Sequence, residues 1–307
     1  MNGAEFVPLS LPPLIIGTLV AVTCALCGNF LVLRRQALIG DAISHVVLPG
    51  IAVGFVITGA VTTGPMLIGA AAAAILSVLM IEAIRRFGRI EPGAAMGVVF
   101  TTLFAAGVLL IEVTDTSSVH LDVEHALYGN LESLIWLEAR GWDALSDPNA
   151  LAALPPELFR VLAVFALIAT LTILFWRPLK ISTFDEGYAA ALGLPVTAIS
   201  LGLVVVSAIA AVAAFDAVGS IIVIAMFICP PAAARLMTDT LSTQILWSLV
   251  IAVLSAVGGF LFAGYGPLWL GFDNAVSAAG MIATLSGLFL AAAALFGPYR
   301  RAILPSG

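Results

Sequence analysis

Nine apolar stretches, each close to the length of about 20 residues that crosses a bilayer as a helix, dominate this sequence. A helix satisfies its own backbone hydrogen bonds, so it is the form that such stretches take in lipid. The sequence therefore predicts an all-α, polytopic membrane bundle of about eight or nine transmembrane helices, with 1–307 as a single domain. The predicted spans are 11–33, 41–60, 64–84, 92–112, 157–178, 195–214, 217–236, 243–265 and 276–298.

Composition supports a membrane protein. Hydrophobic residues make up 62% of the chain and charged residues 10%, whereas a soluble domain has about 25% charged residues. No basic run indicates a nucleic-acid partner. The net charge of -6 sums groups on both sides of a membrane, so it does not point to an acidic or basic partner. The three cysteines, Cys24, Cys27 and Cys229, lie in apolar segments and are expected to be small packing residues.

The positions of Lys and Arg predict how the chain crosses the membrane, because cytoplasmic loops are rich in these residues. If the loop after the first span is cytoplasmic, alternation of the spans places ten of the 12 basic residues on that side. Only Arg140 and Arg160 fall outside. The sequence thus predicts an outside N-terminus and a cytoplasmic C-terminus. The ten are Arg34, Arg35, Arg85, Arg86, Arg89, Arg177, Lys180, Arg235, Arg300 and Arg301.

Three connections stand out between the spans. Residues 113–156 form the long outside loop, in which 123–139 have the pattern of an amphipathic surface helix. Residues 178–194 form the longest inside loop. The spans on either side of Phe215–Asp216 are joined too tightly for an ordinary loop, so one of them is expected to be short or re-entrant. The role of 140–160 is left open by the sequence.

Asp41 and His45 are the residues that most clearly carry chemistry. They are four positions apart at the start of a span, which puts them on one helical face with β-carbons about 5–6 Å apart. A carboxylate and an imidazole can share a divalent cation, and Ser44 is a neighbouring hydroxyl. A buried aspartate is costly in a membrane and marks an ion path. The spacing alone also allows a structural interpretation, with Asp41 as a helix N-cap and His45 at the lipid interface.

A second polar group lies in the outside loop. It could funnel a cation toward the membrane, or it could simply be a solvated acidic loop. Its members are His120, Asp122, Glu124 and His125. Glu132 and Glu138, further along the same loop, are expected to be solvated.

Residues 34–50, Arg-Arg-Gln-Ala-Leu-Ile-Gly-Asp-Ala-Ile-Ser-His-Val-Val-Leu-Pro-Gly, closely resemble a motif of permeases in the manganese, zinc and iron class of bacterial ABC importers. The outside-loop segment Leu-Tyr-Gly-Asn-Leu at 127–131 also resembles that family. So do Phe-Asp-Glu-Gly-Tyr-Ala-Ala-Ala-Leu-Gly-Leu-Pro at 184–195 and the Gly-to-Pro-to-Arg helix at 217–235. The matches follow one another in order over roughly 14–298.

The resemblance implies roles for particular residues. Asp41 and His45 would contribute to the cation site, and a second permease copy or a sister permease would supply two further ligands. The inside segment at about 181–194 would contact an ATPase. A simple interfacial helix is the alternative interpretation of this segment. The residues expected to make this contact are Phe184, Asp185, Glu186, Tyr188, Leu192 and Gly193.

The resemblance also implies a complete transport assembly. The sequence contains no Gly-x-x-x-x-Gly-Lys-Ser/Thr motif, so the chain is expected to be a non-catalytic subunit served by two separate ATPase subunits and an extracytoplasmic metal-binding protein. The expected function is ATP-driven, alternating-access import of a divalent metal across the bacterial cytoplasmic (inner) membrane, with no resident cofactor. Manganese is favoured, with zinc or iron as options. The alternative is a proton- or ion-coupled secondary metal carrier. Homodimer and heterodimer both remain open.

Overall fold

All regular elements are helical in the parts of the chain that the computed structural model describes, which are residues 3–58, 63–113, 131–139, 141–269, 271 and 276–298. The first half contains α1 Gly3–Leu9, α2 Leu11–Leu33, α3 Ile39–Thr58, α4 Thr63–Gly88, α5 Pro92–Val113, and two short 3-10 turns, Leu131–Ser133 and Trp142–Ser146. The second half contains α7 Pro148–Ala152, α8 Pro156–Leu174, α9 Trp176–Phe184, α10 Glu186–Ala191, α11 Val196–Val218, α12 Ser220–Met237, α13 Leu241–Trp269 and α14 Ala278–Phe296. The predicted all-α fold is confirmed.

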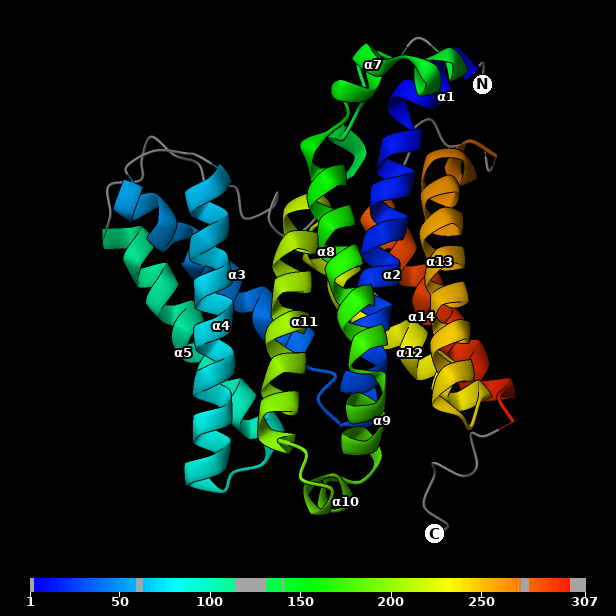
Figure 1. The fold of residues 1–307 in the computed structure, drawn as a ribbon. Coiled ribbons are helices and arrows are strands. Elements are labelled where there is room, and N and C mark those ends of the chain that lie inside the picture. Colours follow the sequence, from blue (N-terminus) through cyan, green and yellow to red (C-terminus); the bar gives the residue numbers. More distant parts are fainter. Residues whose placement is uncertain are drawn as a thin grey trace.

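Nine helices in the described residues are long and apolar enough to cross a membrane. Figure 1 shows α2, α8, α11 and α13 side by side, with α3, α4 and α5 gathered at one side of the bundle. Helix α2 is central, because it packs against α8, α11, α12 and α13. Helix α11 also contacts α3 and α4, and so joins the two groups of helices.

Small residues let the helices of the α3–α4–α5 group approach closely. A β-carbon on Gly50 would lie 2.6 Å from the carbonyl oxygen of Gly69, so only glycine permits this crossing of α3 and α4. A β-carbon on Gly107 would similarly collide with Pro49, where α5 crosses α3. Lipid offers no hydrophobic drive between helices, so close packing of this kind holds them together. This packing fixes α3, the helix that carries Asp41 and His45.

The chain breaks between helices at two places that differ from the predicted span boundaries. The helix predicted over 157–178 ends at Leu174 in the structure. After Phe175 the chain forms a separate helix, α9. The break predicted at Phe215–Asp216 was wrong, because both residues belong to α11 and the chain turns instead at Gly219. Gly219 has φ 79° and ψ 174°, a conformation that is essentially restricted to glycine.

The segment around Trp136 packs on α1 as a small cluster of its own. Trp136 is 1% exposed and donates from Nε1 to the carbonyl oxygen of Ala150 at 2.7 Å. Its backbone N–H donates to Pro8 at 2.8 Å. Residues 131–139 form one 3-10 turn and irregular chain, so the predicted surface helix is wrong over this part. Glu132 is not merely solvated, because it accepts a hydrogen bond from the backbone of Ala278 at the start of α14.

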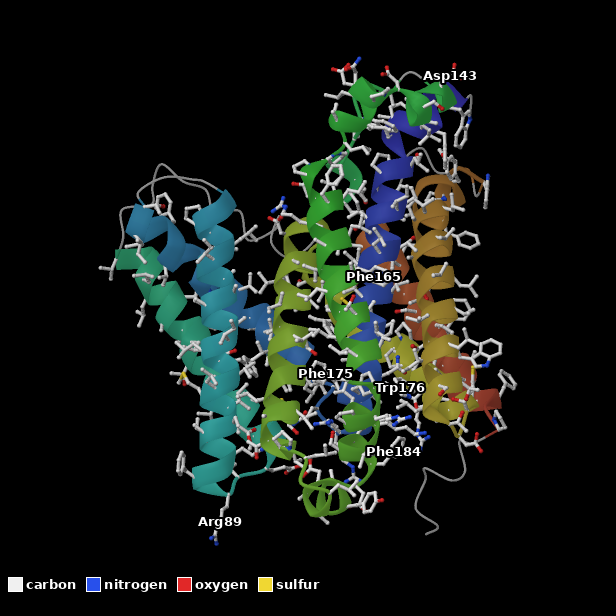
Figure 2. All side chains as sticks on the ribbon, in the orientation of Figure 1. Arg89, Asp143, Phe165, Phe175, Trp176 and Phe184 are labelled. Carbon is white, nitrogen blue, oxygen red and sulfur yellow. The ribbon has the colours of Figure 1, made fainter. Side chains whose placement is uncertain are left out.

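The two ends of the bundle differ in the residues they present. Figure 2 shows Arg89 and Phe184 toward one end and Asp143 at the opposite end. Helix α10 lies at the same end as Arg89, and α7 lies at the end with Asp143 (Figures 1 and 2). The end that carries α10 is called the basic end below.

Candidate metal site

Asp41 and His45 are the third and seventh residues of α3. Asp41 is therefore inside the first turn of the helix and is not its N-cap. The Oδ1 atom of Asp41 lies 3.6 Å from Nε2 of His45, and the two side chains are 37% and 43% exposed, respectively. A separation of 3.6 Å is longer than a hydrogen bond. The two side chains therefore do not hydrogen-bond each other, and the carboxylate and a deprotonated Nε2 could both bind one ligand.

The start of α3 is held in place by its surroundings. The link between α2 and α3 runs from Arg34 to Leu38. Figure 1 shows that it lies nearer the middle of the molecule than α10 does. Gly40 lies against the ring of Phe227 of α12, where a β-carbon would come within 3.1 Å of the ring. The positive end of the α3 dipole favours the negative charge of Asp41. The local fold therefore presents a carboxylate at a fixed position.

Two aromatic side chains of α5 orient the imidazole of His45. The Phe100 ring stacks on it, with centroids 5.1 Å apart and planes 25° apart. Phe104, one turn further along α5, meets it edge-on with centroids 6.1 Å apart. Sequence reasoning missed both residues, although their spacing of four on an adjacent span was a usable signal. The contacts restrict rotation of the imidazole ring.

The spacing of the two donor atoms suits one shared cation. Two metal–ligand bonds of about 2.1 Å at a tetrahedral angle place the donor atoms about 3.4 Å apart, close to the 3.6 Å between Asp41 and His45. One chain nevertheless supplies too few ligands for tight binding. Among the residues that the structure describes, no three His, Cys, Asp or Glu side chains gather closely enough to hold an ion.

The segment predicted to contact an ATPase is built as a tight helix–turn–helix. Helix α9 ends at Phe184, and Asp185 caps α10 by accepting from the backbone N–H of Tyr188 at 2.8 Å. The segment at about 181–194 therefore contains the end of one helix and the whole of a second, short helix. Phe184, Tyr188 and Leu192 are 53%, 56% and 52% exposed, respectively. They form an apolar surface at the tip of the basic end.

The turn after α10 fixes the direction in which the chain enters α11. Gly193 has φ 76°, and its N–H donates to Ala190 while Leu194 donates to Ala189. These two bonds form a Schellman motif, which requires a left-handed residue at the position of Gly193. Glu186 lies in the first turn of α10 and is exposed.

The possible outer funnel lies outside the residues that the structure describes. This applies to His120, Asp122, Glu124 and His125, so their role stays a prediction.

Comparison with known proteins assigns the chain to a family. The model of the ABC 3 transport family matches residues 8–136 and 149–296. This chain belongs to the ABC 3 transport family. Its relatives include the manganese transport system membrane protein MntD of Bacillus subtilis, 41% identical over 92% of this chain and 90% of that protein. The zinc transport system membrane protein TroD of Treponema pallidum is 36% identical over 94% of this chain and 74% of that protein.

A solved structure shares both sequence and fold with this ABC 3 family chain. PsaBC from Streptococcus pneumoniae, solved in complex with Fab, matches with a TM-score of 0.71 and 30% identity, over 94% of this chain and 92% of the other. The predicted family and the polytopic permease fold are thus confirmed. Family membership also favours the ABC permease over the secondary carrier.

Proposed function

We propose that this chain forms the membrane pathway for a divalent metal ion and that Asp41 and His45 touch the ion during its passage. The observation that carries the proposal is the pair of donor atoms 3.6 Å apart on a membrane-spanning helix. A carboxylate that faced only lipid would carry a large free-energy cost, whereas binding of a cation would offset that cost. The names of the relatives in manganese and zinc transport agree with such a cargo.

Manganese is the ion we favour, with zinc or iron as alternatives. One hard oxygen donor and one imidazole nitrogen per chain suit manganese. The same donors would bind zinc more tightly by intrinsic affinity, so selectivity would depend on an extracytoplasmic metal-binding protein. A site with few ligands also releases its ion readily, as a transport pathway requires.

A second permease, identical or a sister chain, would complete the site. The neighbouring helix α5 offers a face on which it could pack. Gly93, Gly97, Thr101 and Ala105 recur every fourth residue, and β-carbons on the two glycines would meet nothing within 4 Å among the residues that the structure describes. Small residues at this spacing favour close helix pairing in membranes. The face adjoins His45 through Phe104, which is 40% exposed.

ATP would be hydrolysed by two separate subunits that dock at the basic end. The apolar surface of Phe184, Tyr188 and Leu192 would enter a groove on the ATPase, as amphipathic helices commonly do. By the distribution of basic residues, this end faces the cytoplasm of a bacterial inner membrane. The N-terminus would then face outward, where a metal-binding protein delivers the ion.

Metal uptake by variants tests the proposal. In cells that depend on this importer, Asp41→Asn and His45→Ala should each lower manganese uptake by about tenfold or more, since loss of even a supporting partner of a metal ligand has an effect of this size. Uptake is measured with radioactive manganese, and zinc and iron are added as competitors to rank the three ions. Co-purification with the ATPase should remain at the wild-type level.

Asp143→Asn is the matched control, because Asp143 is an exposed carboxylate at the end of the bundle opposite the basic end. It should transport normally. Undiminished manganese uptake by Asp41→Asn would refute the proposed role. Loss of the ATPase from that variant would instead show that the aspartate is structural.

A further inference from the structure

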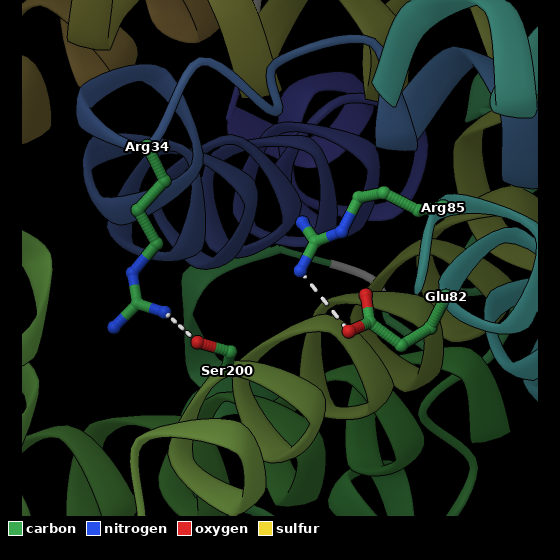
Figure 3. Close-up of polar contacts among 4 residues, drawn as sticks. All are labelled: Arg34, Glu82, Arg85 and Ser200. Carbon is green, nitrogen blue, oxygen red and sulfur yellow. Dashed lines mark hydrogen bonds and ion pairs between the residues drawn. The ribbon is translucent and has the colours of Figure 1, made fainter. Parts of the chain in front are cut away.

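The Arg34 side chain joins three parts of the chain at the basic end. Its Nε donates to Oγ1 of Thr183 at 3.1 Å, and Nη2 donates to Oγ of Ser182 at 2.8 Å, both on α9. Its Nη1 donates to Oγ of Ser200 on α11 at 2.6 Å. Figure 3 shows the last of these contacts, with Arg34 reaching from the α2–α3 link toward α11.

These contacts depend on the geometry of an arginine. Guanidinium donates and never accepts, so each hydroxyl must offer a lone pair. Ser182 can do so because its own hydroxyl proton is directed to the carbonyl oxygen of Pro178 at 2.7 Å. Burial lowers the pKa of Arg34, while the charge of Glu186 acts in the opposite direction. The partly buried cation is held by neutral oxygens, so separating them would leave it poorly solvated.

Arg34 lies between the two functional parts of the chain. On one side, Ser182 and Thr183 directly precede Phe184, where the apolar surface of the basic end begins. On the other side, Arg34 ends α2 and Asp41 follows seven residues later. The connection is stiff, because Gln36 donates to Leu31 at 2.8 Å and Arg35 donates to Val32 at 3.1 Å. This Schellman motif places Arg35 at φ 57°.

A small cavity lies between the link and α4. A cavity of about 20 Å³, enough for one water molecule, separates them and is lined in part by Gln36, Glu82, Arg85 and Ser200. In Figure 3, Arg85 turns to Glu82 of its own helix, at 3.0 Å. The hydrogen bonds of the Arg34 side chain described above thus go to α9 and α11.

We propose that Arg34 is a positioning residue that transmits movement of the ATPase-contacting segment to α3, and so to Asp41 and His45. The inference rests on the proposed contact between this segment and an ATPase. Arg34 does not touch the ion. It makes α9 and the start of α3 move together, so that ATP-driven movement at the basic end changes the position of the two metal donors.

Ion movement and ATP hydrolysis, measured in the same proteoliposomes, test the inference. The complete complex of permease and ATPase is used, with manganese as the ion. Arg34→Gln should lower the number of ions moved per ATP by about tenfold, within the 5- to 150-fold range typical of coupling between sites. Hydrolysis and subunit composition should stay near wild type, and Arg34→Lys should recover part of the ratio. Arg177→Gln is the matched control because Arg177 is an exposed arginine of α9 that lies before the ATPase-contacting segment, and its ratio should be unchanged.

A second variant keeps the test decisive if Arg34→Gln fails to assemble. Ser182→Ala combined with Ser200→Ala retains the arginine and removes two of its acceptors, and it should lower the ratio in the same way. An unchanged ratio in these variants, or a parallel fall in uptake and hydrolysis, would overturn the inference. A Phe184→Glu complex that retains its ATPase would instead refute the proposed docking segment, whatever Arg34 does.

Discussion

Arg160 and Asp216 form an ion pair in which Nη1 and Oδ2 lie 2.6 Å apart, joining α8 near its start to α11 near its end. Glu157 contacts the other terminal nitrogen of Arg160, also at 2.6 Å. The guanidinium therefore lies between two carboxylates. The three side chains are only 19% to 33% exposed. The exposure of the ion pair is therefore intermediate between that of a surface salt bridge and that of a fully buried one.

Removing Asp216 should destabilise the bundle. Asp216→Ala leaves Arg160 partly buried with one partner fewer, and the free energy of unfolding should fall by about 1–3 kcal/mol, between the values for exposed and fully buried pairs. Thermal unfolding in detergent measures the change. Glu157→Gln is the control and should cost less, because Arg160 keeps Asp216 on the adjacent helix. Equal losses in the two variants would contradict this account of the pair.

The aromatic contacts of His45 should matter for ion affinity. Phe100→Leu keeps an apolar side chain but removes the ring that stacks on the imidazole at 5.1 Å. Aromatic pairs contribute about 0.5–1.5 kcal/mol, so KM for manganese should rise about 2- to 10-fold while the yield of the complex is unchanged. Uptake at varied manganese concentration measures this.

Phe262→Leu provides the comparison for Phe100→Leu, because Phe262 packs on Trp269 within α13 and has no contact with His45. Its KM should match wild type. If both variants shift KM equally, the effect comes from general packing and not from orientation of the imidazole.

Hydropathy alone predicted most of the membrane fold, because a span must be apolar over its whole length. It could not place the break at Gly219, since an apolar helix continues on both sides of that residue. The break at Phe175 was missed although Arg177 and Lys180 follow it closely, because the predicted span was carried on to 178. Gly219 could have been noticed as the residue able to adopt the left-handed turn. The break predicted at Phe215–Asp216 assumed that a charge ends a span, whereas Asp216 is accommodated in α11 by Arg160.

The candidate site shows the same limit. The spacing of Asp41 and His45 predicted their proximity, because a helix places residues four apart on one face. The contacts of His45 with Phe100 and of Arg34 with Ser182 and Ser200 depend on how separate helices pack. Sequence separation gives no measure of that packing. Tertiary structure was therefore needed to find the residues that orient the pair and hold the link to α3.

Charge on the apolar surface of the basic end should displace the ATPase. Phe184→Glu and Leu192→Glu each place a carboxylate where an exposed apolar side chain now lies, and affinity for the ATPase should fall at least about tenfold, as for other central interface residues. Co-purification at several protein concentrations measures the loss. Leu137→Glu makes the same change at an 80% exposed leucine outside the segment and should leave the complex intact. Normal co-purification of both segment variants would exclude this docking surface.

Gly193 should be sensitive to a β-carbon for reasons of backbone geometry. Its φ of 76° costs about 1–2 kcal/mol for an ordinary L-residue, while asparagine tolerates it better. Gly193→Ala should therefore speed hydrogen exchange of the α10 amides about 5- to 30-fold and weaken ATPase binding. Gly193→Asn should fall between that variant and wild type. Because a β-carbon here meets nothing within 4 Å in the described part of the chain, the expected loss comes from the backbone conformation and not from a steric clash with described residues. Identical exchange in the alanine and asparagine variants would show that the left-handed turn does not hold α10 in place.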